Sequence, residues 1–250
     1  MRSVLRLSFS LAKTNFKLRN EGSYLGILWY ILSPLLLFLI LLFVKQEAFS
    51  VKNIPYYPIY LLSGLLLFNL FTQIIGSSIV AISSNAGFIK SIKIPMEALV
   101  VSKAIQFLFS HVFEIFLLGL CMFYIGLPLV GLLLYVPVLI LFILFLLGLS
   151  FIVSTIGVYI SDLNNVWTVF SQLLFFVTPI FYVPQMGNLI YQVNEYNPLY
   201  FYMRLAREVL IGGQGVSFNN FIFAGLSSFV VLFAGIFIFA KNKYRFAEHL

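Results

Sequence analysis

His111 and Glu114 lie three residues apart within a long apolar run. In a helix this spacing places both side chains on one face. Ionisable groups inside a membrane segment are costly and are candidates for function. The pair has three open roles: relaying protons, lining a polar path, or bonding to a neighbouring helix or subunit. No second acidic residue lies at depth in the other apolar runs, which argues against a relay and favours hydrogen-bonded packing.

Other residue types offer little chemistry. The chain has two histidines, His111 and His249, and one cysteine, Cys121, so neither a disulfide framework nor a metal cluster is expected. No phosphate-binding loop of the G-x-x-x-x-G-K-[ST] type occurs in the sequence. We therefore expect no catalytic residues, cofactor or metal in this chain. If ATP drives the protein, another chain must bind it.

The composition indicates a membrane protein. Hydrophobic residues make up 62% of the 250 positions and charged residues 9%, against about 45–50% and about 25% in soluble proteins. The net charge of +7 fits basic residues gathered in cytoplasmic loops. Nucleic acid is not expected as a partner, because the sequence lacks a basic run with interleaved aromatic residues.

Residues 1–22 predict an amphipathic helix on the membrane surface. At about 100° per residue, one face collects polar and basic residues, namely Arg2, Arg6, Ser10, Lys13, Lys17 and Asn20. Val4, Leu7, Leu11 and Leu18 share the opposite face. An ordinary solvated helix is the alternative, but the apolar span that follows directly favours the interface.

The apolar runs predict an all-α membrane protein with six transmembrane helices, since a span needs about 20 apolar residues. The expected spans are about 24–44, 57–82, 104–126, 130–156, 166–183 and 218–240. Gly126, Pro128 and Gly131 mark the turn that divides the third span from the fourth. An even number of spans places both termini on the same side.

Basic residues select that side. Eleven basic residues fall on the side of the termini: Arg2, Arg6, Lys13, Lys17, Arg19, Lys90, Lys93, Lys103, Lys241, Lys243 and Arg245. Four fall on the other side: Lys45, Lys52, Arg204 and Arg207. The positive-inside rule therefore predicts cytoplasmic termini.

The outer segment 185–217 is too short for two further spans and too apolar for a simple loop. Asn197-Pro198 is a helix-start signal and Gly212-Gly213 a stop signal. We expect a re-entrant helical hairpin that dips into the outer leaflet, with protein burying its turn.

Four stretches in order, covering essentially the whole chain, resemble one family. They are YLGILWYILSPLL at 24–36, NAGFIKSIKIPMEALVVSKA at 85–104, GVYISDLNNVWTVFSQLLFFVTPIFY at 157–182 and NPLYFYMRLAREVLIGG at 197–213. The chain resembles the transmembrane subunit of ABC-2 type exporters, specifically the permeases for O-antigen, capsule and teichoic acid. Members usually carry Arg directly before the Asp of the fourth loop, where this chain has Ser161 before Asp162. Asp162 is instead expected to cap the following helix.

The resemblance implies a homodimer of permeases with two ATPase subunits that bind ATP and Mg. A short cytoplasmic coupling helix within 85–98 would dock into the ATPase. Its implied contacts are Phe88, Ile89, Lys90, Lys93, Ile94, Pro95 and Glu97. Without the resemblance, the same residues describe an ordinary positive-inside loop.

The implied substrate is a lipid-linked glycan that slides past aromatic side chains. Channel or gate candidates are Tyr30, Phe68, Phe71, Phe175, Phe176, Tyr182, Tyr196 and Tyr200, although any single Phe could equally pack or face lipid. Arg204, Arg207 and Glu208 could hold an exit gate by ion pairs or meet the carrier's pyrophosphate, a group that suits the planar fork of arginine. Arg207 is favoured, because the family usually has Arg at its position.

The predicted function is therefore O-antigen export across the bacterial inner membrane, powered by a separate ATPase. A capsule or teichoic acid permease and an ABC-2 drug or lipid exporter share the same plan and remain alternatives. A proton-coupled carrier or membrane enzyme built on His111 and Glu114 is the alternative from another class.

Overall fold

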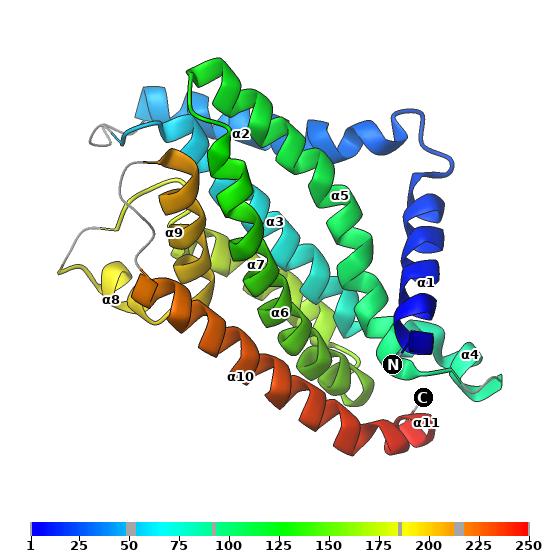
Figure 1. Cartoon of the computed structure of the whole chain (residues 1–250). Helices are drawn as coiled ribbons and strands as arrows, with labels where there is room; N and C mark the ends of the chain where they lie inside the picture. Colours follow the sequence, from blue (N-terminus) through cyan, green and yellow to red (C-terminus); the bar gives the residue numbers. More distant parts are fainter. Residues whose placement is uncertain (1, 49–53, 92–93, 185–186, 213–217, 250) are drawn as a thin grey trace.

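The computed structural model describes residues 2–48, 54–91, 94–184, 187–212 and 218–249, and all regular elements within them are helices (Figure 1). The longer ones are α1 (Arg2–Asn20), α2 (Trp29–Ala48), α3 (Tyr57–Ile79), α5 (Met96–Ile125), α6 (Val130–Tyr159), α7 (Leu163–Val177), α9 (Pro198–Ile211) and α10 (Phe218–Asn242). The short ones are η1 (Gly26–Leu28), η2 (Ser83–Asn85), α4 (Ala86–Ser91), α8 (Leu189–Glu195), η3 (Lys243–Arg245) and α11 (Phe246–His249).

Among the described residues, five helices are long and apolar enough to cross a bilayer: α2 with the preceding η1, α3, α5, α6 and α10. The expected all-α membrane fold is therefore confirmed. The expected six spans are not, because the fifth span, 166–183, contains only the 15 residues of α7. A helix of that length rises about 22 Å, which is less than the roughly 30 Å of the hydrocarbon core.

Helix α7 ends early because Pro179 restricts the backbone of the preceding residue, Thr178. The residue before a proline is pushed out of the helical region, and Thr178 has an extended backbone with ψ of 132°. At the other end, Asp162 occupies the N-cap position but its side chain makes no capping hydrogen bond. Asp162 therefore stands at the expected position, but the expected capping hydrogen bond from its side chain is not formed.

Helix α5 begins earlier than the expected third span, 104–126. Pro95 has an extended backbone at the N-cap position, and Glu97 lies in the first turn, where a carboxylate interacts favourably with the helix dipole. Lys103 interrupts the apolar pattern without interrupting the helix. The other expected spans match helices of the structure to within a few residues.

Helix α3 is the centre of the bundle. Inside the chain, 72% of its apolar window is buried, against 17% for α2 and 17% for α10. It contacts α2, α5, α6, α7 and α9. Polar side chains on α3 are therefore placed to meet groups from several helices.

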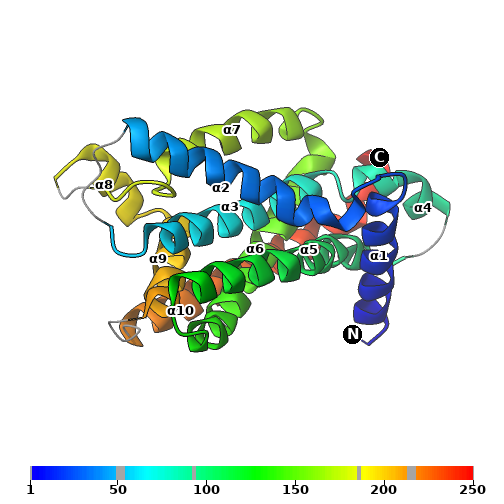
Figure 2. The ribbon, with the colours of Figure 1, turned by 90° about the horizontal axis from the view of Figure 1, so that it is seen from above.

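The bundle has two distinct ends (Figures 1 and 2). We call the end that carries α1, α4, α11 and both chain termini the terminal end, and the end that carries α8 and α9 the hairpin end. Helix α1 lies across the direction of the long helices in both views and packs against α5. The predicted helix within 1–22 is confirmed, and its place on a membrane surface stays a prediction.

The segment expected to form a re-entrant hairpin, 185–217, contains two helices, α8 and α9, and its insertion into the outer leaflet stays a prediction. The Asn197 side chain accepts a hydrogen bond of 3.0 Å from the Leu199 amide, and Pro198 occupies the first turn. Helix α9 ends before Gly212, whose φ of +54° suits glycine. The predicted start and stop are confirmed, although Gly213 lies outside the described residues.

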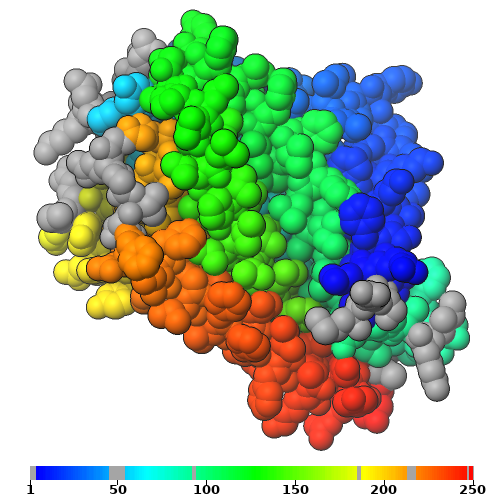
Figure 3. Space-filling view, in the orientation of Figure 1, coloured from blue at the N-terminus to red at the C-terminus, as the bar shows by residue number. Residues whose placement is uncertain are grey.

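Glycines set the closest helix crossings. Gly148 of α6 and Gly235 of α10 meet so closely that a Cβ at either would overlap the other backbone, the packing that small residues permit in membranes. Gly126 makes the α5–α6 turn with φ of +81°. Gly131, expected in that turn, lies inside α6 against the α9 backbone. Figure 3 shows α5, α6 and α10 side by side on one face.

A separate hydrophobic cluster closes the terminal end. Phe246 is fully buried against Phe239, with ring centroids 5.3 Å apart, and Phe151 meets Phe239 edge to face at 5.1 Å. Beside it, Lys243 Nζ lies 2.8 Å from Glu97 Oε1. The last residues of the chain are thereby joined to the start of α5.

Candidate functional site

His111 and Glu114 are both buried on α5. His111 Nδ1 lies 2.6 Å from Glu114 Oε2, and His111 Nε2 lies 3.0 Å from the Tyr135 hydroxyl on α6. Their exposed fractions are 1% and 3%. The structure thus places the pair in hydrogen bonds to neighbouring helices, which is the packing role favoured from sequence.

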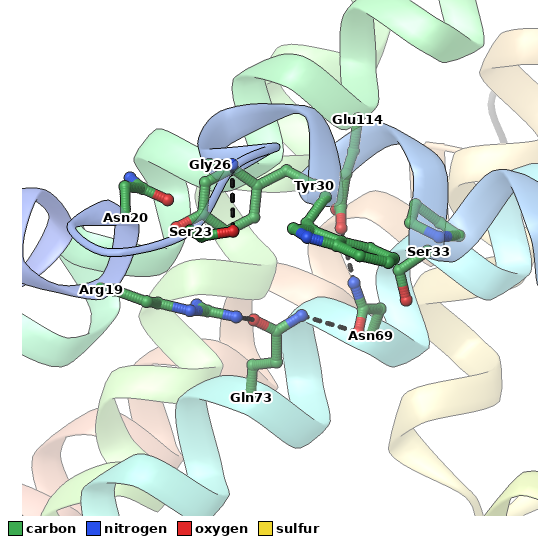
Figure 4. Close-up of a pocket in the computed structure, with 11 residues that line it drawn as sticks. Arg19, Asn20, Ser23, Gly26, Tyr30, Ser33, Asn69, Gln73 and Glu114 are labelled. Carbon is green, nitrogen blue, oxygen red and sulfur yellow. Dashed lines mark hydrogen bonds between the residues drawn. The ribbon is translucent and has the colours of Figure 1, made fainter.

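The second oxygen of Glu114 continues the hydrogen-bonded series. Asn69 Nδ2 of α3 donates to Glu114 Oε1 at 2.5 Å, and Gln73 Nε2 donates to Asn69 Oδ1 at 2.7 Å. Arg19 of α1 then donates from Nη1 and Nη2 to Gln73 Oε1, at 3.2 and 3.3 Å (Figure 4). We call this series, from Tyr135 through His111, Glu114, Asn69 and Gln73 to Arg19, the polar chain.

The Arg19 end of the polar chain borders a cavity of about 320 Å³. Its walls come from the end of α1, the turn into α2 and the first turns of α2. Three residues of the polar chain complete them: Asn69, Gln73 and Glu114 (Figure 4). We call it the elbow pocket. Its volume falls at the lower end of the range for small-molecule sites.

Tyr30 is the unusual member of the elbow pocket. Its side chain is 7% exposed, and within the described residues its hydroxyl has no hydrogen-bond partner. The Tyr30 ring stacks on Phe16 at 5.5 Å and lies 5.0 Å from the Arg19 guanidinium carbon. Buried hydroxyl groups are normally hydrogen-bonded, so this one is available to a ligand or to water.

Arg207 organises the hairpin end. Its guanidinium donates three hydrogen bonds to backbone carbonyls: Nε to Tyr60 O at 3.2 Å, Nη1 to Pro179 O at 2.9 Å and Nη2 to Ile180 O at 3.0 Å. The side chain is 6% exposed. We call this arrangement the Arg207 clasp. Two of these carbonyls, Pro179 O and Ile180 O, follow the early end of α7, and the third, Tyr60 O, belongs to α3, so the clasp joins the segment after α7 to α3.

The surroundings of the clasp are shaped for the guanidinium. Its carbon lies 3.5 Å from the Tyr60 ring centroid, a cation–π contact. A Cβ at Gly64 would lie 2.5 Å from Arg207 Nη2, so glycine leaves room for it. Burial lowers the pKa of Arg207, but arginine remains protonated in proteins. The Tyr60 hydroxyl also donates to Tyr182 O at 2.8 Å.

The sequence-based ion pair for Arg207 is wrong, because its three described hydrogen bonds go to backbone carbonyls. Arg204 and Glu208 do approach each other, with Arg204 Nε 3.5 Å from Glu208 Oε1. Both border a cavity of about 620 Å³ at the hairpin end, together with Tyr60 and Tyr200. Contact with a pyrophosphate stays a prediction.

The predicted channel aromatics fall into separate groups. Phe68, Phe71 and Phe175 lie together, with Phe68 and Phe175 centroids 5.4 Å apart. Phe175 also contacts Phe176, which is 67% exposed. The Tyr182 hydroxyl donates to Val177 O at 2.6 Å and so helps to close α7.

The remaining aromatics lie apart from this group. Tyr30 belongs to the elbow pocket, Tyr200 borders the hairpin-end cavity and Tyr196 is 86% exposed. Which of the aromatics line a channel stays a prediction.

The coupling segment forms α4 at the terminal end. Phe88 and Lys90 are exposed on it, whereas Ile89 and Ile94 pack against the hydrophobic cluster of that end. Pro95 and Glu97 belong to the start of α5. Lys93 lies outside the described residues, so its contact remains a prediction.

Sequence reasoning missed Arg19, Asn69, Gln73 and Tyr135 as members of a site. Asn69 and Gln73 did carry a signal: two carboxamides four residues apart within an apolar span occupy one helix face and need polar partners. From the sequence, Arg19 is expected only as one of the basic residues on the cytoplasmic side. Lys243 carried no signal for its contact with Glu97, which is distant in sequence.

Comparison with known proteins decides the family. The sequence profile of the ABC-2 type transporter family matches residues 6–211, which include most of α1, the polar chain, α4 and the Arg207 clasp. The chain belongs to the ABC-2 type transporter family. The resemblance seen in the four sequence stretches is thus confirmed, and ABC-2 proteins are multi-pass membrane proteins that serve as transport subunits.

Individual relatives of the ABC-2 family match nearly the whole chain. An O-antigen export system permease protein, RfbA of Klebsiella pneumoniae, is 28% identical over 243 residues, covering 96% of this chain and 93% of that protein. The RfbA protein of Myxococcus xanthus is 27% identical over 248 residues, covering 98% and 95%. The polysialic acid transport protein KpsM of Escherichia coli is 26% identical over 227 residues, covering 88% and 86%.

Proposed function

We propose that this chain is the permease subunit of an ATP-driven exporter that moves a lipid-linked polysaccharide of the O-antigen type out of the cytoplasm across the bacterial inner membrane. The observation that carries the proposal is the match to O-antigen export permeases over nearly the full length of both chains. Exporters of this family work with ATP-binding subunits, so ATP and Mg would be bound by a partner and not by this chain.

The proposal places the terminal end in the cytoplasm. Eleven of the 15 basic residues belong to segments expected on that side. Both chain termini lie at this end together with α4 (Figure 1). Exposed Lys90 and Phe88 would then face an ATPase, while Ile89 anchors α4 to the bundle. An anchored coupling helix transmits a rigid-body movement of its partner to the spans.

Helix α7 supports a homodimer. None of its residues is buried within one chain. One face collects polar side chains, which are Asn164, Asn165, Thr168, Ser171 and Gln172, and the opposite face is apolar. Polar side chains at membrane depth need a protein or water-filled surrounding. A second copy of this chain would supply it and would enclose a path for the glycan.

The test is co-expression with a candidate ABC ATPase from the same genome, followed by purification through a tag on the ATPase. We expect this chain to co-purify, and the complex in nanodiscs to hydrolyse ATP and export lipid-linked glycan. A chain that stays alone and moves the glycan without the ATPase would overturn the proposal.

Lys90→Glu tests the coupling helix. Reversing an exposed charge on α4 should weaken docking and lower stimulated ATPase activity about tenfold, which corresponds to about 1.4 kcal/mol. Lys241→Glu makes the same charge change at the end of α10 and should leave activity near the wild-type value. Equal activity in the Lys90→Glu and wild-type complexes would show that α4 is not the coupling element.

A capsular polysaccharide is the second candidate substrate, because the polysialic acid transport protein of Escherichia coli also matches most of the chain. Strains lacking either an O-antigen permease or a capsule permease distinguish the two. This chain is expressed in each strain together with its partner ATPase. Restored surface O-antigen supports the first candidate, and restored capsule without restored O-antigen supports the second.

A further inference from the structure

We infer that the elbow pocket is a binding site for one neutral sugar unit of a glycan. The pocket has the volume of a small-molecule site, about 320 Å³, and its polar groups come from α1, the turn after it, α2, α3 and α5. The aromatic residues Trp29 and Tyr30 form part of its wall, and Figure 4 shows Tyr30 beside the polar side chains.

The charges of the pocket favour a neutral ligand. Arg19 and Glu114 are the charged residues in its lining, and their opposite charges offset each other. Glu114 is 3% exposed and already accepts a hydrogen bond from Asn69, while Arg19 donates to Gln73. A phosphate would meet a buried carboxylate without a compensating cation of its own, which is unfavourable. A sugar brings no such charge.

The hydrogen-bonding groups suit a polyhydroxyl compound. Each sugar hydroxyl both donates and accepts, and the carboxamides of Asn69 and Gln73 each retain one N–H beyond the bonds described. The decisive group is the Tyr30 hydroxyl, which is buried and has no hydrogen-bond partner within the described parts of the chain. Trp29, 47% exposed, offers a flat face to the C–H side of a sugar ring.

The position of the pocket suggests when a sugar would occupy it. It lies at the junction of α1 and α2, near the terminal end of the bundle (Figure 2). The assignment to a glycan awaiting export rests on the proposed function, which places this end in the cytoplasm. The sugar-binding chemistry of the pocket itself does not depend on that placement.

Tryptophan fluorescence provides the direct test. The chain has two tryptophans, so Trp167→Phe leaves Trp29 in the pocket wall as the reporter. The full-length chain in nanodiscs is titrated with the methyl glycosides of mannose, galactose, glucose and N-acetylglucosamine, and separately with inorganic pyrophosphate. We expect saturable change with at least one glycoside and none with pyrophosphate. A saturable fluorescence change with pyrophosphate would overturn the inference, and so would the lack of a saturable change with every glycoside.

Tyr30→Phe, in the Trp167→Phe background, tests the unpaired hydroxyl. The change removes one oxygen that forms no hydrogen bond with the described residues, so the protein should fold normally. Glycoside affinity should fall about threefold to tenfold, the effect of one neutral hydrogen bond. Tyr124→Phe is the matched control, since Tyr124 is 91% exposed at the far end of α5. The glycoside affinity of this variant should equal that of the Trp167→Phe protein. Unchanged affinity in Tyr30→Phe would contradict the assignment.

The same preparation separates the two proposals. A complex that associates with its ATPase and exports glycan, but whose Trp29 reports no glycoside, would leave the proposed function intact and reject the pocket. A chain that binds glycosides but neither associates with an ATPase nor exports glycan would reject the proposed function and keep the pocket.

Discussion

Arg207 and Arg19 lie toward opposite ends of the bundle and contact the same central helix, α3, in opposite ways. Arg207 is buried and donates to three backbone carbonyls. Arg19 is exposed and donates to one side-chain oxygen, Gln73 Oε1, beside an open pocket. Backbone carbonyls cannot leave the contact without a change of fold, whereas a carboxamide can rotate toward a ligand. The first arginine therefore holds structure, and the second is free to serve binding.

The largest effect expected from this contrast is at the clasp. Arg207→Gln removes the guanidinium hydrogen bonds to the buried carbonyls of Pro179 and Ile180, and we expect a loss of about 3 kcal/mol or more. The measurement is the apparent melting temperature of the detergent-solubilised chain. Gly64→Ala, whose Cβ would meet Arg207 Nη2, should lower the same temperature.

Arg204→Gln is the control for the clasp, because Arg204 is 49% exposed and its pair with Glu208 is a surface contact. It should melt within a degree or two of the wild-type chain. Equal melting temperatures for Arg207→Gln and Arg204→Gln would show that the clasp contributes no more than a surface arginine.

An intermediate effect is expected in the middle of the polar chain. Glu114→Gln keeps the shape of the side chain but removes the charge that His111 and Asn69 contact, so about 1–2 kcal/mol should be lost. The change should be non-additive with Asn69→Ala, because both alter one hydrogen bond. Additive losses in melting experiments would indicate that the two side chains do not interact.

The smallest effect on stability is expected for Arg19→Gln, at about 0.5 kcal/mol or less, since the side chain is exposed. Its effect should instead be seen in glycoside binding, because Arg19 borders the pocket. A large fall in melting temperature would contradict the contrast between the two arginines and assign Arg19 a structural role.

Sequence patterns predicted the helices better than their ends. Apolar length and the turn at Gly126 located α5 and α6, because burial in lipid depends on summed hydropathy. The expected third span begins at 104, whereas α5 begins at Met96. Hydropathy marks the part of a helix that lies in lipid, and the helix itself extends beyond the lipid. The end of α7 could have been read from Thr178-Pro179, a local rule that the apolar run at 166–183 obscured.

The contacts of individual polar residues were less accessible. Tyr60, Pro179 and Arg207 meet only in three dimensions, and a carbonyl acceptor leaves no mark in the sequence. Asn69 and Gln73 were visible as a polar pair, but their connection to Glu114 and Arg19 depends on how α1, α3 and α5 pack. The type of a residue suggested chemistry, and only the fold showed its partners.

The buried Phe246 and the Lys243–Glu97 contact have a practical consequence for handling the protein. Residues up to Phe246 belong to the folded body beside α4, the proposed coupling helix. An affinity tag or fluorescent fusion attached directly behind them would occupy the surface where an ATPase is proposed to dock. A flexible spacer, or a label on the exposed hairpin end at Tyr196, would keep that surface accessible.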